Sequence, residues 1–385
     1  MEEVLYKFKV ATLFALLALL TPAALQAQDV TYVNANGEEA TLSDGSYTLL
    51  TNQTELTDGW WVVDGEVNYG NRITINGAVH LVLLDGATLN AGNGIYVDAN
   101  KELHIYAQIG DNATLNATAT SDNEAGIGGN IHGTAGLIEV NGGHVIAKGG
   151  KYAAGIGGGG NGYWSGKYGN AGTFIINGGH VEATGGDNGG AGIGGGGYTS
   201  TNSITGGDGG IVTINGGIVE ARGGKDGYGV GPGTSGHDGN SASLSLGWRN
   251  PSDYIYMSTV KANVTFTNVF FFENDEQVTA ESDLNGRTIY PYDGEVHNVV
   301  FMVDGELYAK RTVAYGYTVA EPARPVKKGK TFEYWYASDA TQAYDFSAPV
   351  TTDLTLNARF RDFSIQTDES GNYLIGRESD GSEFA

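Results

Sequence analysis

Apolar and polar residues alternate along most of the chain between residues 60 and 243. In the middle of this stretch one phrase occurs three times: LIEVNGGHVIAKGG from Leu137, TFIINGGHVEATGG from Thr173 and IVTINGGIVEARGG from Ile211. On both sides of the Asn-Gly-Gly corner every second residue is apolar, which is typical of a strand with one buried face. Because Asn and Gly tolerate positive φ, the corner can bend the chain sharply. Each phrase therefore predicts a strand, a corner and a second strand.

The copies recur at a nearly fixed period. Their turn asparagines are Asn141, Asn177 and Asn215, so the steps are 36 and 38 residues. A second phrase, AGIGG, begins at Ala125 and returns as AGIGGGG at Ala154 and Ala191. One unit of this size cannot bury its own apolar face, whereas stacked copies form a continuous core. The alternative is a flexible Gly-rich linker, but a linker would not keep Ile and Val in register.

These patterns predict an all-β protein with a Gly-rich parallel β-helix over residues 61–243. A solenoid needs a cap at each open end. Residues 28–60 are polar with short strand signals, and we expect them to form the N-terminal cap. Residues 244–292 contain the aromatic strands of Val260–Phe272, and we expect them to form a closing β segment.

The first 27 residues have the pattern of a secretory signal peptide. Lys7 and Lys9 precede the apolar run Ala11–Leu20, and Pro22 and small residues follow up to Ala27. The run is short for a membrane span. We expect cleavage after Ala27, no membrane span after that cleavage, and a secreted or cell-envelope location. An uncleaved anchor is the alternative.

The composition of the chain limits the kinds of partner and the kinds of chemistry that we expect. The formal net charge is −23, which disfavours nucleic acid and anionic membranes, because both require clustered Lys and Arg. The chain has no Cys, so disulfides, thiol catalysis and Cys-ligated zinc are excluded. No cofactor is indicated.

Residues 293–361 follow a different pattern, with short strands and paired aromatics. The informative stretches are VVFMVDG from Val299, TVAYGYTVAEPARPVKKGKTFEYWY from Thr312 and YDFSAPVTTDLTLNARF from Tyr344. This segment resembles a Listeria–Bacteroides repeat, the B-repeat of internalin-type surface proteins. The resemblance implies a small β-grasp-like domain. Tyr334 and Phe360 stand where the family usually has Gly and an aromatic residue, commonly Trp.

The Ala-Gly-Ile-Gly-Gly and Ile-Asn-Gly-Gly phrases resemble repeats of large bacterial surface proteins. That resemblance implies a spacer or an interaction module of the cell envelope, and it supplies no catalytic residue. Residues 362–385 are expected to be a tail that includes the start of a further module.

The long Gly-rich loops carry the candidate ligand-binding residues. These are Tyr163, Trp164 and Tyr168 in one loop and Tyr198 in the next. Aromatic rings on surface loops can stack on sugar rings, because they offer a flat apolar face with a polar edge. The alternative is that the rings fold back and cover the coil beneath them.

Two histidines occupy equivalent positions in successive repeats, namely His144 and His180. A histidine ladder can hold a metal ion. However, the third copy has Ile218 at this position, and the histidines alternate with buried Val. We therefore predict a stacked surface ladder and no metal site.

The function that fits best is a non-catalytic adhesion or binding module for an extracellular glycan or a host or cell-surface protein. The alternative is a β-helix polysaccharide lyase or glycosidase, which requires paired carboxylates or a carboxylate cluster with a base. The candidates for such chemistry are Asp187, Asp208, Asp226, Lys225 and Arg222. All lie in or beside Gly-rich turns, where Asp is common for backbone reasons.

Overall fold

The computed structural model describes residues 28–161, 169–198, 205–247, 250, 252–272, 274, 276–328, 330–337, 340, 342–362, 366–367 and 373–374. The chain divides into two compact units. One consists of Met1–Thr267 with Ala280–Tyr290, and the other of Asn268–Thr279 with Pro291–Ala385. The first unit contains the repeats, and the second contains the C-terminal sheet.

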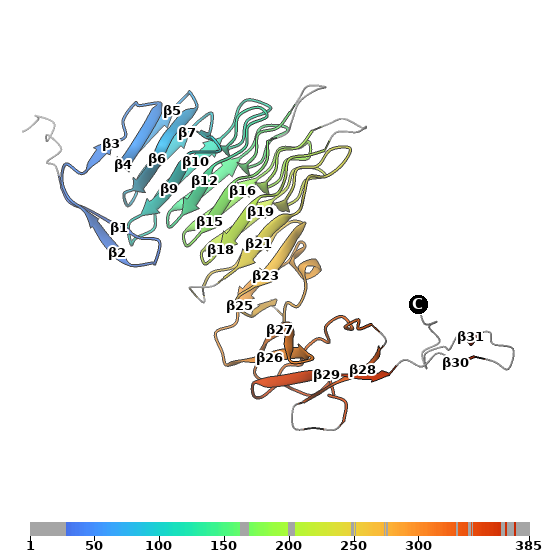
Figure 1. The fold of residues 1–385 in the computed structure, drawn as a ribbon. Coiled ribbons are helices and arrows are strands. Elements are labelled where there is room, and N and C mark those ends of the chain that lie inside the picture. Colours follow the sequence, from blue (N-terminus) through green and yellow to red (C-terminus); the bar gives the residue numbers. More distant parts are fainter. Residues whose placement is uncertain are drawn as a thin grey trace, which may run out of the picture. The chain divides into compact units, whose positions relative to one another are not determined.

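The first unit is a stack of coils whose strands form three parallel rows (Figure 1). The first row, the Val-Ala sheet, comprises β5 (Glu66–Tyr69), β7 (Thr88–Ala91), β10 (Thr114–Thr118), β13 (His144–Lys148), β16 (His180–Thr184), β19 (Ile218–Arg222) and β22 (Ile255–Met257). The Ile-Gly row comprises β8 (Ile95–Val97), β11 (Ile127–Gly128), β14 (Ile156–Gly157), β17 (Ile193–Gly194) and β20 (Val230–Gly231). The long sheet comprises β4 (Glu55–Val63), β6 (Ile73–Leu83), β9 (Glu102–Ala107), β12 (Leu137–Val140), β15 (Thr173–Ile176), β18 (Ile211–Ile214), β21 (Ala242–Leu246) and β23 (Ala262–Phe266). The predicted parallel β-helix is confirmed.

Successive coils are aligned residue by residue, so like side chains stack inside the helix. In the Val-Ala sheet, Val145 pairs with Val181 and Val181 with Val219, and all three side chains have no exposed surface. In the long sheet, Phe174 lies between Ile138 and Val212 on the neighbouring strands. The period of two in the sequence therefore places one apolar row per sheet into a shared core.

The Ile-Gly row explains the repeated Ala-Gly-Ile-Gly phrase. Each isoleucine points into the core, while the following glycine lies against the backbone of the next coil. Gly157 has a φ of +139°, and a Cβ atom on it would lie 2.0 Å from the carbonyl oxygen of Gly194. Only glycine permits this backbone conformation and this close approach.

The N-terminal segment covers the outer face of the long sheet. Strands β1 (Val30–Val33) and β2 (Glu39–Leu42) form an antiparallel hairpin, and β3 (Tyr47–Leu49) pairs in parallel with β4. Val30 and Leu42 of the hairpin pack on Val62, Val82 and Tyr106. Side chains that point away from the helix core are buried here because the hairpin lies over them.

Regular coils continue past residue 243. Strands β22 and β23 extend two of the parallel rows, and Val219 pairs with Ile255. The stack then ends with a short 3-10 helix, η1 (Glu281–Leu284), and with β25 (Thr288–Pro291), which pairs antiparallel to β22. The segment predicted to close the stack thus contributes both further coil and its antiparallel end.

The second unit is built on a mixed four-stranded sheet in the order β27-β26-β29-β28. Its strands are β26 (Val296–Val303), β27 (Glu306–Ala314), β28 (Lys330–Ala337) and β29 (Leu354–Asp362). Strands β26 and β29 are parallel at the centre, and the outer pairs are antiparallel, which is a β-grasp-like strand order. Trp335 and Phe301 meet edge to face at 5.0 Å in the core. The unit also contains β24 (Phe270–Phe272), β30 (Gln366–Thr367) and β31 (Tyr373–Leu374).

Within the described parts of the chain, no helix combines the length and the hydrophobicity needed to cross a bilayer.

Candidate functional site

A groove with polar and apolar lining follows the corners that join the long sheet to the Val-Ala sheet. It encloses about 730 Å³. Its lining comes from successive coils: Asp111, Asn141, Asn177, Gly217 and Asp253. The turn of the β1–β2 hairpin contributes Asn36 and Gly37 at one side. The groove therefore runs across the stack, and each coil contributes the same part of its backbone.

An asparagine ladder lies beneath this groove. The Nδ2 of Asn177 donates to Oδ1 of Asn141 at 2.8 Å, and Nδ2 of Asn215 donates to Oδ1 of Asn177 at 2.9 Å. Asn141 and Asn177 are buried, and a buried amide requires such partners. At the end of the ladder, Nδ2 of Asn141 is buried without a hydrogen-bond partner among the described residues. The ladder fixes the corners, and with them the groove floor.

Two carboxylates line the groove from the corners on either side of the ladder. Asp111 accepts a hydrogen bond from the backbone N–H of Gly143, and Asp253 accepts one from Gly217 at 2.7 Å. Burial raises the pKa of both carboxyl groups. Because the two glycines lie two coils apart, their N–H groups are separated by roughly 10 Å along the stack. Both carboxylates thus have a structural partner at a chain corner.

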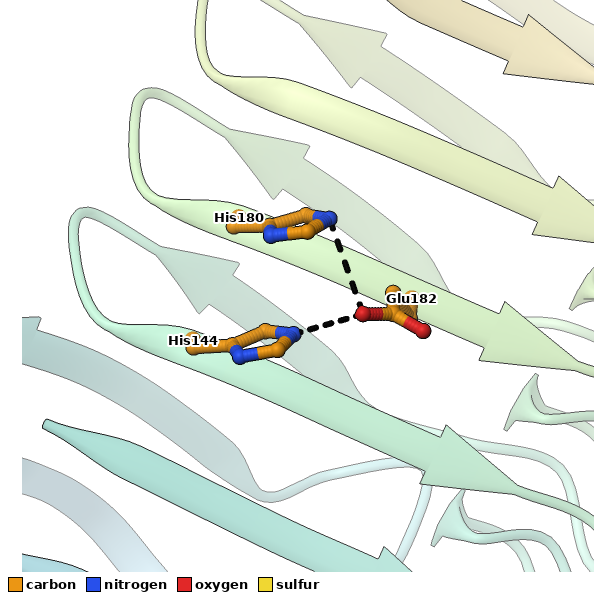
Figure 2. A group of neighbouring side chains, drawn as sticks. All are labelled: His144, His180 and Glu182. Atoms are coloured by element: carbon orange, nitrogen blue, oxygen red, sulfur yellow. Dashed lines mark hydrogen bonds and ion pairs between the residues drawn. The ribbon is translucent and has the colours of Figure 1, made fainter. Parts of the chain in front are cut away.

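A cluster of two imidazoles and one carboxylate lies beside the groove on the Val-Ala sheet (Figure 2). The rings of His144 and His180 stack with centroids 4.3 Å apart and planes 5° from parallel. The Nε2 of His144 lies 2.7 Å from Oε1 of Glu182, and Nε2 of His180 lies 3.7 Å from the same oxygen. Burial, followed by the neighbouring His144, lowers the pKa of His180. The predicted stacked ladder is therefore present, and a carboxylate joins it.

Of the four aromatic residues predicted to bind sugar, the structure describes one. Tyr163, Trp164 and Tyr168 lie outside the described residues. Tyr198 is only 7% exposed, and its ring lies 6.3 Å from that of Tyr152. Tyr198 matches the alternative in which a loop aromatic covers the coil, and its buried ring corrects the expectation of an exposed stacking face.

Two of the candidates for lyase or glycosidase chemistry, Asp208 and Arg222, make structural contacts. Oδ1 of Asp208 accepts the N–H of Asn240 at 2.8 Å. Arg222 pairs with Glu220 at 2.6 Å and lies over the ring of Tyr256. These contacts agree with the alternative that such residues stabilise turns and the protein surface.

Sequence reasoning missed the groove and its two carboxylates. Asn141, Asn177 and Asn215 were interpreted only as turn formers, although their recurrence at one position was a signal for a ladder. Asp111 precedes the phrase ATLNA, and Asp253 follows a Pro-Ser pair, so the two share no local pattern. Only the stacking brings both to the same groove.

A second aromatic stack lies on the outer face of the long sheet. Trp60 stacks on His80 at 4.5 Å, and His80 stacks on His104 at 4.7 Å. The Nδ1 of His104 lies 2.5 Å from Oε2 of Glu139. This hydrogen bond raises the pKa of His104, whereas burial and then the neighbouring His104 lower the pKa of His80. The pKa values of the two rings are thus shifted in opposite directions.

Glu139→Gln tests the ion pair at His104. Because the folded-state pKa of His104 is raised, its stabilisation is fully present below its unfolded value of about 6.5 and disappears as the pH rises through the folded value. We expect the substitution to lower the free energy of unfolding by roughly 1.5–3 kcal/mol near pH 5.5 and by less near pH 9. Urea unfolding at both pH values measures the difference. The control is Glu102→Gln, because the Glu102 side chain is 50% exposed and its contact with His104 is longer, at 3.3 Å. An equal loss at both pH values for Glu139→Gln would contradict the prediction.

Comparison with protein families identifies both architectural parts. The beta helix repeat model matches residues 138–160, 174–197 and 212–236, and the Listeria-Bacteroides repeat domain model matches residues 297–359. The chain is a β-helix repeat protein with a C-terminal Listeria–Bacteroides repeat. Both resemblances drawn from the sequence are confirmed. Each beta helix match spans one strand of the long sheet, an Asn-Gly-Gly corner, one strand of the Val-Ala sheet and one strand of the Ile-Gly row. In this β-helix repeat protein, the repeated unit therefore includes the corners that line the groove.

Both repeat families are typical of bacterial surface proteins. A comparison with curated proteins found no match.

Proposed function

We propose that this protein is a non-catalytic binding module of the bacterial cell exterior, and that its β-helix binds a linear extracellular glycan along the groove over the Asn-Gly-Gly corners. The observation that carries the proposal is the groove of about 730 Å³ over the repeated Asn-Gly-Gly corners. The signal-like N-terminus and the two repeat families support the proposed location of the protein outside the cell.

The chemistry of the groove suits sugar hydroxyl groups. Its lining combines amides, carboxylates and glycine backbone with apolar side chains, among them Ile109, Ile218 and Val33. Amides and carboxylates accept or donate hydrogen bonds in several directions, as hydroxyl-rich ligands require. With a net charge of −23 the chain attracts a neutral or cationic polymer more readily than a polyanion. The favoured substrate class is therefore a neutral glycan.

The groove also presents equivalent positions at a regular spacing, as a binding site for a polymer requires. Coils stack at about 4.8 Å, which is comparable with the length of one sugar residue in an extended chain. Asn177 and Gly178 in one coil are followed by Gly217 in the next, so equivalent backbone positions recur along the groove. A ligand with its own repeat can use several of these positions at once.

The contacts of the carboxylates support a binding role over catalysis. Asp111 and Asp253 accept the N–H groups of Gly143 and Gly217, which lie roughly 10 Å apart along the stack. That spacing is at the outer limit for the two carboxyl groups of an inverting glycosidase and about twice that of a retaining enzyme. Asp208 and Arg222 are likewise engaged in structural contacts.

The loop aromatics Tyr163, Trp164 and Tyr168 are a second proposed contact for the glycan. Substitution of these residues measures their contribution to binding separately from that of the groove. If a host or cell-surface protein is the partner instead, the glycan assays will fail with both surfaces intact.

Ser252→Trp tests the groove. Ser252 is exposed and lines it, so an indole there fills part of the channel. Ser243→Trp is the matched control, because Ser243 is equally exposed but lies on β21 of the long sheet, outside the groove lining. On a glycan array followed by calorimetry, we expect Ser252→Trp to weaken binding by about tenfold or more, roughly 1.4 kcal/mol, and Ser243→Trp to leave it unchanged. Equal binding by both variants would exclude the groove, and a loss restricted to a Tyr163, Trp164 and Tyr168 to Ala variant would move the site to the loop.

Polysaccharide cleavage is the second candidate, because the raised pKa values of Asp111 and Asp253 are a property of general acids. A product-release assay on pectin, alginate and host glycans tests it. Turnover that is lost in Asp111→Asn or Asp253→Asn would favour this candidate over a binding module.

A further inference from the structure

We propose that His144, His180 and Glu182 form a binding site for one divalent transition-metal ion, with Zn²⁺ as the preferred ion. The ligands are the Nε2 atoms of the two histidines and the carboxylate of Glu182, all within 4.8 Å of one another. Zinc binding here does not require the proposed glycan binding, although His180 also lines the groove.

The strand register places the three side chains together. His180 and Glu182 are two residues apart on β16, so both point to the outer face of the Val-Ala sheet. His144 pairs directly with His180 across the parallel ladder between β13 and β16. Figure 2 shows both rings and the carboxylate on this face, with the nitrogens directed toward the same oxygen.

The distances are close to those of a coordinated ion. Zinc binds imidazole nitrogen and carboxylate oxygen at about 2.0–2.2 Å, so its ligand atoms lie roughly 3–4 Å from each other. Glu182 Oε1 already lies 2.7 Å from Nε2 of His144 and 3.7 Å from Nε2 of His180. The three side chains are 32%, 32% and 41% exposed, so an ion can enter from solvent and small side-chain rotations are free.

One nitrogen of this cluster has only a long contact, with Oε1 of Glu182 at 3.7 Å. Nε2 of His180 is buried and has no hydrogen bond within the part of the chain that the structure describes. It nevertheless points toward Glu182, as Figure 2 shows. A metal ion shared with Glu182 and His144 would satisfy this nitrogen, which the protein leaves unsatisfied.

The ligand types select the ion. Two imidazoles and one carboxylate suit Zn²⁺ and its neighbours in the transition series, whereas Ca²⁺ and Mg²⁺ require mostly oxygen ligands. The nearest further carboxylate in the ladder, Glu220, accepts hydrogen bonds from Tyr254 at 2.8 Å and Arg222 at 2.6 Å. Three protein ligands therefore leave a coordination position for water. His180 also lines the groove, so this position lies at the groove edge.

Zinc titration of the full chain, produced without a histidine tag, tests the site. By calorimetry we expect one Zn²⁺ per chain, released by EDTA, and no comparable binding of Ca²⁺ or Mg²⁺. His180→Ala and His144→Ala should each weaken binding by about a hundredfold or more, and the isosteric Glu182→Gln by about tenfold or more. The control is His237→Ala, an exposed histidine outside the cluster, which should bind as the wild type does.

Circular dichroism of each variant shows whether the fold is retained. A wild-type chain that takes up no zinc at millimolar concentration would overturn the proposal. So would an unchanged affinity in a folded His180→Ala variant.

Discussion

Gly157→Ala is expected to destabilise the β-helix by roughly 3–5 kcal/mol. The new Cβ would lie 2.0 Å from the carbonyl oxygen of Gly194, which is far inside contact distance. In addition, Gly157 has a φ of +139°, a conformation that L residues avoid. Relief would require the two coils to separate, and every coil in the stack depends on that spacing. Urea unfolding followed by circular dichroism measures the loss.

Two further glycines separate the steric effect from the backbone effect. Gly70 has open space where an added Cβ would lie and no positive φ, so Gly70→Ala should change stability by less than about 0.5 kcal/mol. Gly45 has open space but a φ of +76°, so Gly45→Ala should cost about 1 kcal/mol. If Gly157→Ala costs no more than Gly45→Ala, the close packing of the Ile-Gly row does not limit stability.

Phe174→Ala is expected to cost roughly 3–5 kcal/mol. Phe174 is 2% exposed and is the largest side chain in its row of the long sheet, between Ile138 and Val212. Its removal leaves a cavity that cannot collapse easily, because the backbones of the neighbouring coils are fixed by their ladder hydrogen bonds. The midpoint of thermal unfolding should fall accordingly.

Ile175→Ala is the matched control for Phe174→Ala. Ile175 is adjacent on the same strand but points to the outer face and is partly exposed. It should cost about 1 kcal/mol. Similar losses for the two variants would mean that the period of two does not divide β15 into a core face and an outer face.

The coil packing that Gly157→Ala and Phe174→Ala disturb also determines the shape of the groove. The Asn-Gly-Gly corners are held by the asparagine ladder and by the coil spacing that the Ile-Gly row sets. A binding surface on such a scaffold is pre-organised, so a ligand does not have to order it on binding. The histidine cluster uses the same spacing, because His144 and His180 come from adjacent coils.

The sequence alone determined the repeat architecture. Alternating Ile and Val on both sides of Asn141, Asn177 and Asn215 predicted strands that pair in parallel, because a unit with one apolar face must stack. The Listeria–Bacteroides segment followed from its own residues, since its paired aromatics and turn positions recur in a recognisable order.

The tertiary structure alone decided which side chains meet. The groove combines Asp111 and Asp253 with the asparagine ladder, although they are far apart in the sequence and follow no shared motif. The sequence placed His144 and His180 at equivalent positions, but only the strand register brought Glu182 into reach of both. The tertiary structure also buries Tyr198, although its position in a loop suggested that it was exposed. The physical reason is that local patterns fix the face on which a residue lies, whereas stacking of coils with unequal loops fixes its neighbours.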